Sequence, residues 1–482
     1  MLRSIFLILS GNVSRAVLLM VRNLVIARLI SLEDYGIAST FALAMAIVEM
    51  MSTLGLQQQM VQAKNGNDPH LQAALQGFQA MRAVINGVIL FALSWPLASF
   101  FGHPELVLPY QLVALIPVVQ GFSHFDVHRM SRQMNYMPIF LLTVLPALAS
   151  VVLVWPLYYV FGDYKVMLYA LLAQAIIQMA ISHLVAERSY RLAFDRRIIL
   201  ESVRFGWPIL LNGILIFAIY NGERLIVGRA LGMEELALFS MALSLSLTPA
   251  LVMTNSVVSF FLPQLSAAAE DGPVFRHIAA TTFQTHLLFG NLMVLGVTLS
   301  GGPFLHYVLG DKYAAAIPLL TWMAIMQGIR LIKSGSATVS LSRGHTANAL
   351  VANLMRVVLL PVAWYVVVQG GSLQHVIWIG IGAELFGLLL GLWLTFWRLK
   401  LPRRPMVVPF LISTALFVLA GVQAQTKQNA ADWLPDPIAG LGLVVLFGLA
   451  LVSMQDFLRY LRQRKLITRG PEPAALPPHT EF

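Results

Sequence analysis

The chain has 482 residues, of which 58% are hydrophobic and only 11% charged, and its formal net charge is +10. Ordinary soluble domains carry about 25% charged residues, so this composition excludes a typical soluble surface. The Lys and Arg residues stand in short segments between apolar runs, which argues against a nucleic-acid-binding surface, and the lack of cysteine excludes disulfides and thiol chemistry.

Apolar runs recur along the whole chain, and each is close to the roughly 20 residues that a helix needs to cross a hydrocarbon core of about 30 Å. Backbone groups inside that core must bond within their own segment, so the spans are helices. We therefore predict an all-α polytopic membrane protein with about fourteen transmembrane helices. In chain order the predicted spans are 4–27, 36–62, 74–100, 105–123, 138–161, 166–186, 205–228, 236–264, 278–300, 314–332, 348–368, 373–396, 406–423 and 437–457.

The segments between these spans alternate in charge. One set, together with the two termini, carries twenty-two Lys and Arg residues, Arg330 and Lys333 among them, whereas the opposite set carries five. Lys and Arg concentrate in loops on the cytoplasmic side of a membrane. The pattern predicts a multi-pass protein of the cytoplasmic (inner) membrane with both termini in the cytoplasm.

An internal repeat is indicated by residues 23–39, which align without gaps on residues 224–240. The identical pairs are Leu24 with Leu225, Arg28 with Arg229, Glu33 with Glu234, and Ser39 with Ser240. Six spans separate the copies, so the copies share one orientation, and transporters built from repeats place their site at the repeat interface. Chance similarity between two amphipathic hairpins is the alternative.

Charged residues inside the predicted spans are the candidate site. The candidates for binding a pyrophosphate headgroup in a cavity are Arg15, Arg22, Arg82, Arg224 and Arg356. An arginine at the centre of a span costs about 2.5–3.5 kcal/mol on insertion scales, so such residues face water or partners. Arg15 and Arg22 are seven residues apart and share one helix face. Guanidinium groups bind phosphate oxygens bidentately and keep their charge, which favours an anionic headgroup as cargo.

Two other interpretations of these residues stay open. Arg224 and Arg356 can instead pair with carboxylates on other spans. Glu49, Glu223 and Glu384 are candidates for ion coupling, because desolvation raises the pKa of a carboxyl group, or they are neutral carboxyls that hold helices together. No arrangement of residues indicates a nucleophile triad, a metal site or a cofactor.

A family resemblance rests on the first predicted hairpin, where a helix ends in Ala-Arg, an acidic turn follows, and a Gly-Leu pair precedes a polar stretch. The residues that carry this pattern are Arg28, Glu33, Asp34, Tyr35, Gly36, Gly55 and Leu56. The segments 205–208 and 309–313 add to it. The chain resembles the polysaccharide exporters of the multidrug/oligosaccharidyl-lipid/polysaccharide (MOP) superfamily, in particular those of the colanic-acid and succinoglycan type.

The resemblance implies a V-shaped pair of six-helix lobes around a central cavity, with two additional C-terminal helices. The implied division is residues 1–200 for the N-terminal lobe, 201–400 for the C-terminal lobe, 401–460 for the extra helices and 461–482 for a disordered cytoplasmic tail.

It also implies a flippase, not an enzyme. The expected cargo is an undecaprenyl-pyrophosphate-linked oligosaccharide, moved to the outer face by alternating access for exopolysaccharide, capsule or O-antigen (lipopolysaccharide) biosynthesis. A polysaccharide polymerase and a chain-length regulator are the expected partners, with membrane lipid around the protein.

The alternatives are a small-molecule or drug antiporter of the same superfamily, an integral-membrane polysaccharide polymerase or ligase, and a structural partner of a synthesis complex. Such antiporters have twelve spans and acidic cavities, whereas polymerases and ligases carry catalytic residues on long outer loops. This chain has excess intramembrane arginine and no long outer loop, which favours the flippase.

Overall fold

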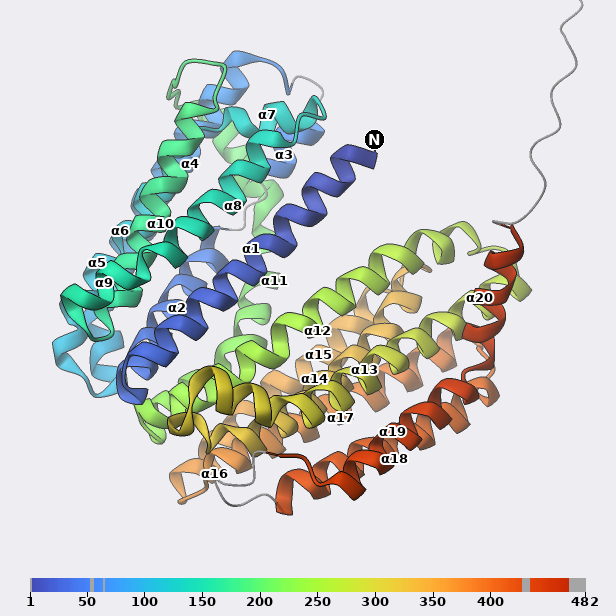
Figure 1. Cartoon of the computed structure of the whole chain (residues 1–482). Coiled ribbons are helices and arrows are strands. Elements are labelled where there is room, and N and C mark those ends of the chain that lie inside the picture. Colours follow the sequence, from blue (N-terminus) through green and yellow to red (C-terminus); the bar gives the residue numbers. More distant parts are fainter. Residues whose placement is uncertain (1, 53–55, 64–65, 427–433, 468–482) are drawn as a thin grey trace, which may run out of the picture.

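The computed structural model describes residues 2–52, 56–63, 66–426 and 434–467, and every regular element within these ranges is a helix (Figure 1). We call the first group of helices the N lobe. It consists of α1 (Leu2–Leu29), α2 (Leu32–Ser52), α3 (Leu56–Gln62), α4 (Pro69–Phe101), the 3-10 helix η1 (Pro104–Leu106), α5 (Val107–Val113), α6 (Leu115–Gly121), α7 (Asp126–Arg132), α8 (Met137–Val152), α9 (Val154–Phe161) and α10 (Lys165–Leu184).

The second group, which we call the C lobe, begins with α11 after the linker 185–195. It consists of α11 (Arg196–Ala230), α12 (Met233–Ala267), α13 (Gly272–Leu309), the 3-10 helix η2 (Asp311–Tyr313), α14 (Ala316–Leu341), α15 (Ala347–Val358), α16 (Leu360–Val368) and α17 (Leu373–Leu399). Three further helices follow: α18 (Arg404–Thr426), α19 (Pro437–Ser453) and α20 (Gln455–Ile467).

Local sequence sets the starts of four long helices. Asp68, Asp195, Asp271 and Asp436 each precede a helix and accept a hydrogen bond from a backbone N–H of its first turn. Such N-caps satisfy donors that the helix itself leaves free. A proline stands in the first turn of α4, α13 and α19, where its missing N–H costs nothing.

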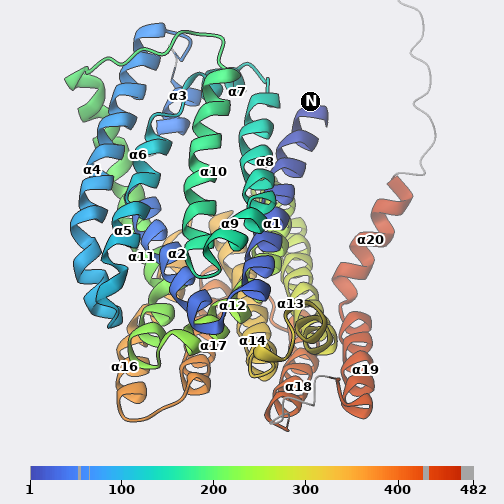
Figure 2. The same ribbon diagram turned by 60° about the vertical axis from the view of Figure 1, so that its left-hand side comes forward.

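The two lobes form a V. Figures 1 and 2 show helix bundles that meet where the α1–α2 and α11–α12 turns lie and lean apart toward the end that carries the start of α1 and helix α20. We call the meeting point the vertex and the other end the open end. Among the described segments that the charge pattern assigns to the cytoplasm, α7, the linker 185–195 and α20 lie at the open end (Figures 1 and 2).

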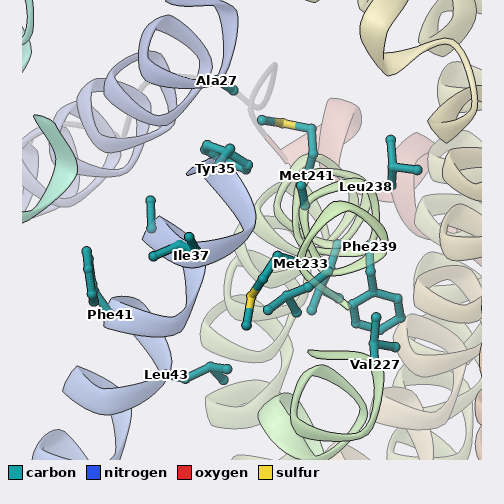
Figure 3. Close-up of a cluster of buried hydrophobic side chains, with 14 of the residues drawn as sticks. Ala27, Tyr35, Ile37, Phe41, Leu43, Val227, Met233, Leu238, Phe239 and Met241 are labelled. Carbon is teal, nitrogen blue, oxygen red and sulfur yellow. The ribbon is translucent and has the colours of Figure 1, made fainter. Parts of the chain in front are cut away.

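The vertex is built by the two hairpins that the sequence aligned as a repeat. Helix α1 ends at Leu29 and α2 begins at Leu32, whereas α11 ends at Ala230 and α12 begins at Met233, so the boundaries fall at equivalent places of the alignment. A Cβ atom on Gly36 would lie 2.0 Å from the carbonyl oxygen of Met233. The lobes therefore approach to backbone contact, and buried apolar side chains of the two hairpins pack together around this point (Figure 3).

Polar groups also cross between the lobes at the vertex. The Lys312 ammonium of the C lobe donates to the carbonyl oxygens of Arg28, at 2.9 Å, and Ile30 at the end of α1. The Arg28 guanidinium lies directly against Gly310 of the C lobe, and Arg229 reaches toward Gly102 of the N lobe in the corresponding way. Each repeat hairpin thus contacts the opposite lobe.

The prediction of an all-α polytopic membrane protein is confirmed. In the described residues eight helices are long and apolar enough to cross a membrane, and two bent helix pairs raise the number to ten if each counts as one span. Within the described residues every predicted span falls on one helix or on consecutive helices, but the count of fourteen stays a prediction.

Several boundaries differ from the sequence prediction. Helix α11 begins at Arg196 where the predicted span begins at 205, and α13 covers Gly272–Leu309 where the predicted span is 278–300. Arg330 and Lys333, which we assigned to a cytoplasmic loop, lie inside α14 because a buried carboxylate on α17 binds both of them. The last predicted span stops at Ser453, where the chain turns by 64° into α20. Helix α20 continues to Ile467, past the predicted start of the tail at 461, and residues 468–482 lie outside the described ranges.

Candidate functional site

A cavity of about 670 Å³ lies inside the N lobe between α1, α4, α6, α8 and α10, and we call it the N-lobe cavity. Its polar lining consists of arginines, glutamines, histidines and hydroxyls: Arg15, Arg82, Gln57, Gln79, Gln120, Gln174, Gln178, His124, His128, Ser123 and Thr143. Among the described residues that line it there is no Asp or Glu. The described lining therefore offers positive charge and hydrogen-bond donors and contributes no carboxylate of its own.

Arg82 is the member of this lining with the largest unmet bonding capacity. Its Nε and one terminal nitrogen, Nη1, are buried and have no hydrogen-bond partner within the described residues. Leaving buried donors unpaired costs about 1–3 kcal/mol per group. Arg15 is exposed and forms no hydrogen bond or ion pair within the described part of the chain. Both guanidinium groups are thus free to receive an anion.

Arg22 stands beside the N-lobe cavity and connects to it through a glutamine. One terminal nitrogen of Arg22 donates to Gln174 Oε1 at 2.7 Å, and the group also bonds Asn23 Oδ1. Gln174 itself lines the cavity. Arg22 is buried with amide partners and no carboxylate among the described residues, so it adds positive charge to this wall.

Close packing of α4 on α6 holds Arg82 in position. A Cβ atom on Gly121 would lie 1.9 Å from the Cβ of Ala83, the neighbour of Arg82. The Gln79 amide, one turn earlier on α4, donates to the carbonyl oxygens of Gly121 and Ser123 at 3.0 and 3.2 Å. The wall that presents Arg82 is therefore fixed by contacts made on both sides of it.

The C lobe contains a second set of charges, which we call the C-lobe ion-pair cluster: Glu223 on α11, Arg330 and Lys333 on α14, Arg356 on α15, and Glu384 on α17. Arg356 bridges both carboxylates, at 2.6 Å to Glu223 Oε2 and 2.7 Å to Glu384 Oε1, and its Nε donates to the Ile219 carbonyl. Glu384 also accepts from Arg330 at 2.9 Å and from Lys333 at 2.6 Å. The cluster ties four helices together.

One face of α17 makes this cluster possible. Gly380, Glu384, Gly387 and Gly391 are spaced four, three and four residues apart, so they share a face of the helix. A Cβ atom on Gly387 would lie 2.4 Å from the Ala352 carbonyl oxygen, and one on Gly380 would lie 2.4 Å from Glu223 Oε1. The glycines let α11 and α15 come close enough for their charged groups to reach Glu384.

The five predicted arginines do not line one cavity. Arg15 and Arg82 line the N-lobe cavity and Arg22 adjoins it, whereas Arg356 is buried in ion pairs in the C lobe. Arg224 makes one long contact to Asn221, at 3.4 Å, and its buried Nε has no described partner. Arg224 and Arg22 both act electrostatically on Tyr35 near the vertex.

Two of the predicted ion-coupling carboxylates, Glu223 and Glu384, belong to the C-lobe ion-pair cluster. Glu49 falls in α2 among residues whose side chains lie outside the described part of the structure. The structure thus places two of these three carboxylates, and both have resident cations.

Sequence reasoning missed the glutamines, histidines and hydroxyls of the N-lobe cavity and two of the five members of the C-lobe ion-pair cluster. A signal for the first was present, because Gln174 and Gln178 are four residues apart in an apolar helix and share a face. For Arg330 and Lys333 the same spacing rule applies, but they stand at the end of the predicted span 314–332, where the charge pattern favours a loop.

A family model described as "Polysaccharide biosynthesis protein" matches residues 25–318. The chain is 22% identical to the teichuronic acid biosynthesis protein TuaB of Bacillus subtilis (strain 168), over 87% of this chain and 88% of that protein. It is 20% identical to the succinoglycan biosynthesis transport protein ExoT of Rhizobium meliloti (strain 1021), over 94% of this chain and 92% of the relative.

Among solved structures, the lipid II flippase MurJ in an inward closed conformation superposes with a TM-score of 0.67 at 12% identity. The match covers 96% of this chain and all of the other. A likeness at this identity concerns the fold, and it agrees with the MOP-superfamily architecture expected from the first hairpin.

Proposed function

We propose that this chain, which belongs to the polysaccharide biosynthesis protein family, is a transporter that flips a lipid-linked oligosaccharide. The cargo of this proposal is an undecaprenyl-pyrophosphate-linked repeat unit. It moves from the cytoplasmic to the outer face by alternating access. Two names support the choice of cargo: a relative is a succinoglycan biosynthesis transport protein, and a structural neighbour is a lipid II flippase.

The observation that carries the proposal is the unpaired state of Arg82 beside Arg15 in a cavity without described carboxylates. A pyrophosphate would give the buried N–H groups of Arg82 charged acceptors, and hydrogen bonds to charged groups contribute about 1.5–3 kcal/mol each. Arg15 and Arg82 would bind the headgroup, with Arg22 acting through Gln174. The remaining glutamines suit sugar hydroxyls, because an amide both donates and accepts.

The orientation follows from the charge of the loops. Lys and Arg concentrate at the open end of the V, and such loops face the cytoplasm. In this proposal the protein sits in the inner membrane with both termini inside, and the V is open toward the side where the cargo is made. A polymerase and a chain-length regulator would take the unit after it has been flipped.

Ion coupling through Glu223 or Glu384 is not part of the proposal. Glu223 pairs with Arg356, and Glu384 pairs with Arg330, Lys333 and Arg356. A coupling cation would therefore have to displace a resident cationic side chain. Glu49 stays the candidate for such a role.

The test is flipping of a fluorescent undecaprenyl-pyrophosphate disaccharide in proteoliposomes, with quencher added outside. We expect Arg82→Gln and Arg15→Gln each to lower the rate at least tenfold. Arg197→Gln is the matched control, because Arg197 is exposed at the open end and pairs only with Glu201. Wild-type rates in the double variant Arg15→Gln/Arg82→Gln would remove the site assignment.

A further inference from the structure

The C-lobe ion-pair cluster does not balance its own charge. It holds three cationic side chains, Arg330, Lys333 and Arg356, against two carboxylates. Side-chain exposure is 13% for Arg330, 8% for Lys333 and 3% for Arg356, and it is 5% or less for the carboxylates. Each cation contacts a carboxylate, but buried excess charge is costly, so a bound anion would stabilise the surplus of one positive charge.

No such counter-ion is present among the described neighbours. Tyr220 lies under the Arg330 guanidinium, with 4.9 Å from Cζ to the ring centroid, but a ring face carries no net charge. Helix α12 contributes only Leu247, Ala250, Leu251 and Thr254 to this region. Arg224, beside Glu223 in the chain, would only increase the positive surplus.

A second cavity adjoins the surplus charge, and we call it the C-lobe cavity. Its volume is about 270 Å³, and Arg330, Lys333, Gln327, Tyr220, Ser334 and Asn353 are among its lining residues. This volume is below the roughly 300–1,000 Å³ of pockets for drug-sized ligands. It therefore suits one anionic group or a single sugar, not an entire oligosaccharide.

Two buried donors in the lining have no partner. The Gln327 side chain is fully buried; its Oε1 accepts from Arg330, but its Nε2 has no hydrogen bond within the described residues. The Arg330 terminal nitrogen Nη2 lies 2.9 Å from Glu384 Oε1 without hydrogen-bond geometry, and it too is unsatisfied. Two donors without a hydrogen bond and the surplus positive charge of the cluster thus lie at one place.

We propose that the C-lobe cavity is an oxyanion site. Arg330 Nη2 and Gln327 Nε2 donate to one singly charged oxyanion, and Lys333 adds charge from the cavity wall. The chemistry fits a carboxylate on a sugar of the cargo or a free phosphate. The sugar carboxylate rests on the proposed function, because it makes the C lobe a second contact for a cargo with acidic sugars. Binding of free phosphate does not rest on it.

The test uses the full-length protein carrying Arg15→Gln and Arg82→Gln, so that the N-lobe cavity contributes no anion binding. Sodium glucuronate and sodium phosphate are titrated separately by calorimetry at constant ionic strength, with sodium chloride as reference. We expect one site per chain. Arg330→Gln removes the surplus charge and Gln327→Leu removes the neutral donor, and each should weaken binding at least tenfold.

Tighter binding of glucuronate would assign the site to an acidic sugar, and tighter binding of phosphate to the free ion; both support the oxyanion site. Equal responses to chloride and to both oxyanions, or unchanged affinity in Arg330→Gln and Gln327→Leu, would overturn it. Arg330→Lys keeps the charge and should retain most of the binding, which separates loss of the site from misfolding. The titration measures anion binding and not flipping. A failure of this oxyanion site and a failure of the proposed function would therefore appear in different experiments.

Discussion

Arg82 of the N lobe and Arg356 of the C lobe both lie in helices apolar enough to span a membrane, but their surroundings differ. Arg356 bonds two carboxylates and a backbone carbonyl, so its donors are largely used within the fold. Arg82 has buried donors with no described partner and faces a cavity. An arginine inside a span can therefore form structural ion pairs or keep its donors available beside a cavity. The presence of a carboxylate on a facing helix distinguishes these two cases.

The ion pairs of the C lobe serve stability, although one surplus cation there is left for the oxyanion that we propose, whereas the arginines that line the N-lobe cavity have no carboxylate partner among the described residues. In the C lobe the charges hold α11, α14, α15 and α17 together. In the N lobe the charges are held in place by apolar and amide contacts, and their own bonding capacity stays open. A ligand that supplies oxyanions would complete the N-lobe cavity, whereas removal of a carboxylate would disrupt the C lobe.

The largest effect should come from Glu384→Gln. This change leaves Arg330, Lys333 and Arg356 with one carboxylate among them, and breaking a buried ion pair from one side costs about 3–5 kcal/mol. We expect a large fall in the melting temperature of the detergent-purified protein. Glu201→Gln, which touches only the exposed pair with Arg197, should change stability by less than about 0.5 kcal/mol. Equal melting temperatures would show that the cluster is not structural.

Arg82→Met should act in the opposite direction. Methionine keeps much of the apolar stem but removes the unpaired N–H groups, each of which costs about 1–3 kcal/mol. We expect the free energy of unfolding to rise by about 1 kcal/mol while polymer export is lost. Arg197→Met should leave both unchanged. If Arg82→Met destabilised the protein as much as Glu384→Gln, the two arginines would be equivalent and the comparison between the lobes would fail.

A third prediction concerns two glycines on α17. Gly380→Ala places a methyl group 2.4 Å from Glu223 Oε1, which would displace Glu223 from Arg356 and cost about 1–3 kcal/mol. Gly382→Ala is the control, because nothing lies within 4 Å of its Cβ position and alanine favours a helix by up to about 1 kcal/mol. The same melting assay should therefore show opposite signs for two identical substitutions two residues apart.

The helices and the repeat were predictable from sequence because their causes are local, but the contact of the two hairpins at the vertex was not, since Gly36 and Met233 are remote in the chain. Apolar run length fixes the spans, and the aligned hairpins end and begin at equivalent residues. The sites were only partly predictable, since the partner of each arginine is remote in the chain: Gln174 is 152 residues from Arg22, and Glu223 is 133 residues from Arg356. Spacing places Arg15 and Arg22 on one face, but it carries no information about which facing helix presents an amide and which a carboxylate.

The smallest effect should arise where the lobes meet. Lys312 bonds the carbonyl oxygens of Arg28 and Ile30 at the end of α1, and a cation at a helix C-terminus contributes about 0.3–1 kcal/mol. Burial, and secondarily the charge of Arg28, lower the pKa of Lys312, so the cost of burying the charge at the closed vertex outweighs this gain. Lys312→Met removes that cost together with two hydrogen bonds to carbonyl oxygens, so the melting temperature should stay nearly unchanged, and any shift toward separation of the lobes should reflect the loss of those hydrogen bonds.

Distances between spin labels on the α1–α2 turn and on η2 would measure that shift, with Lys165→Met as control because Lys165 pairs with Asp163 inside the N lobe. The lowered pKa means that the folded closed state binds fewer protons than the separated state does. Raising the pH from the lowered pKa toward the usual 10.5 should thus favour closure in the wild type, and this dependence should vanish in Lys312→Met. If the wild type and Lys312→Met gave the same distance distribution at every pH, the hydrogen bonds of Lys312 would not contribute to closure. The vertex would then be held by the apolar contacts alone.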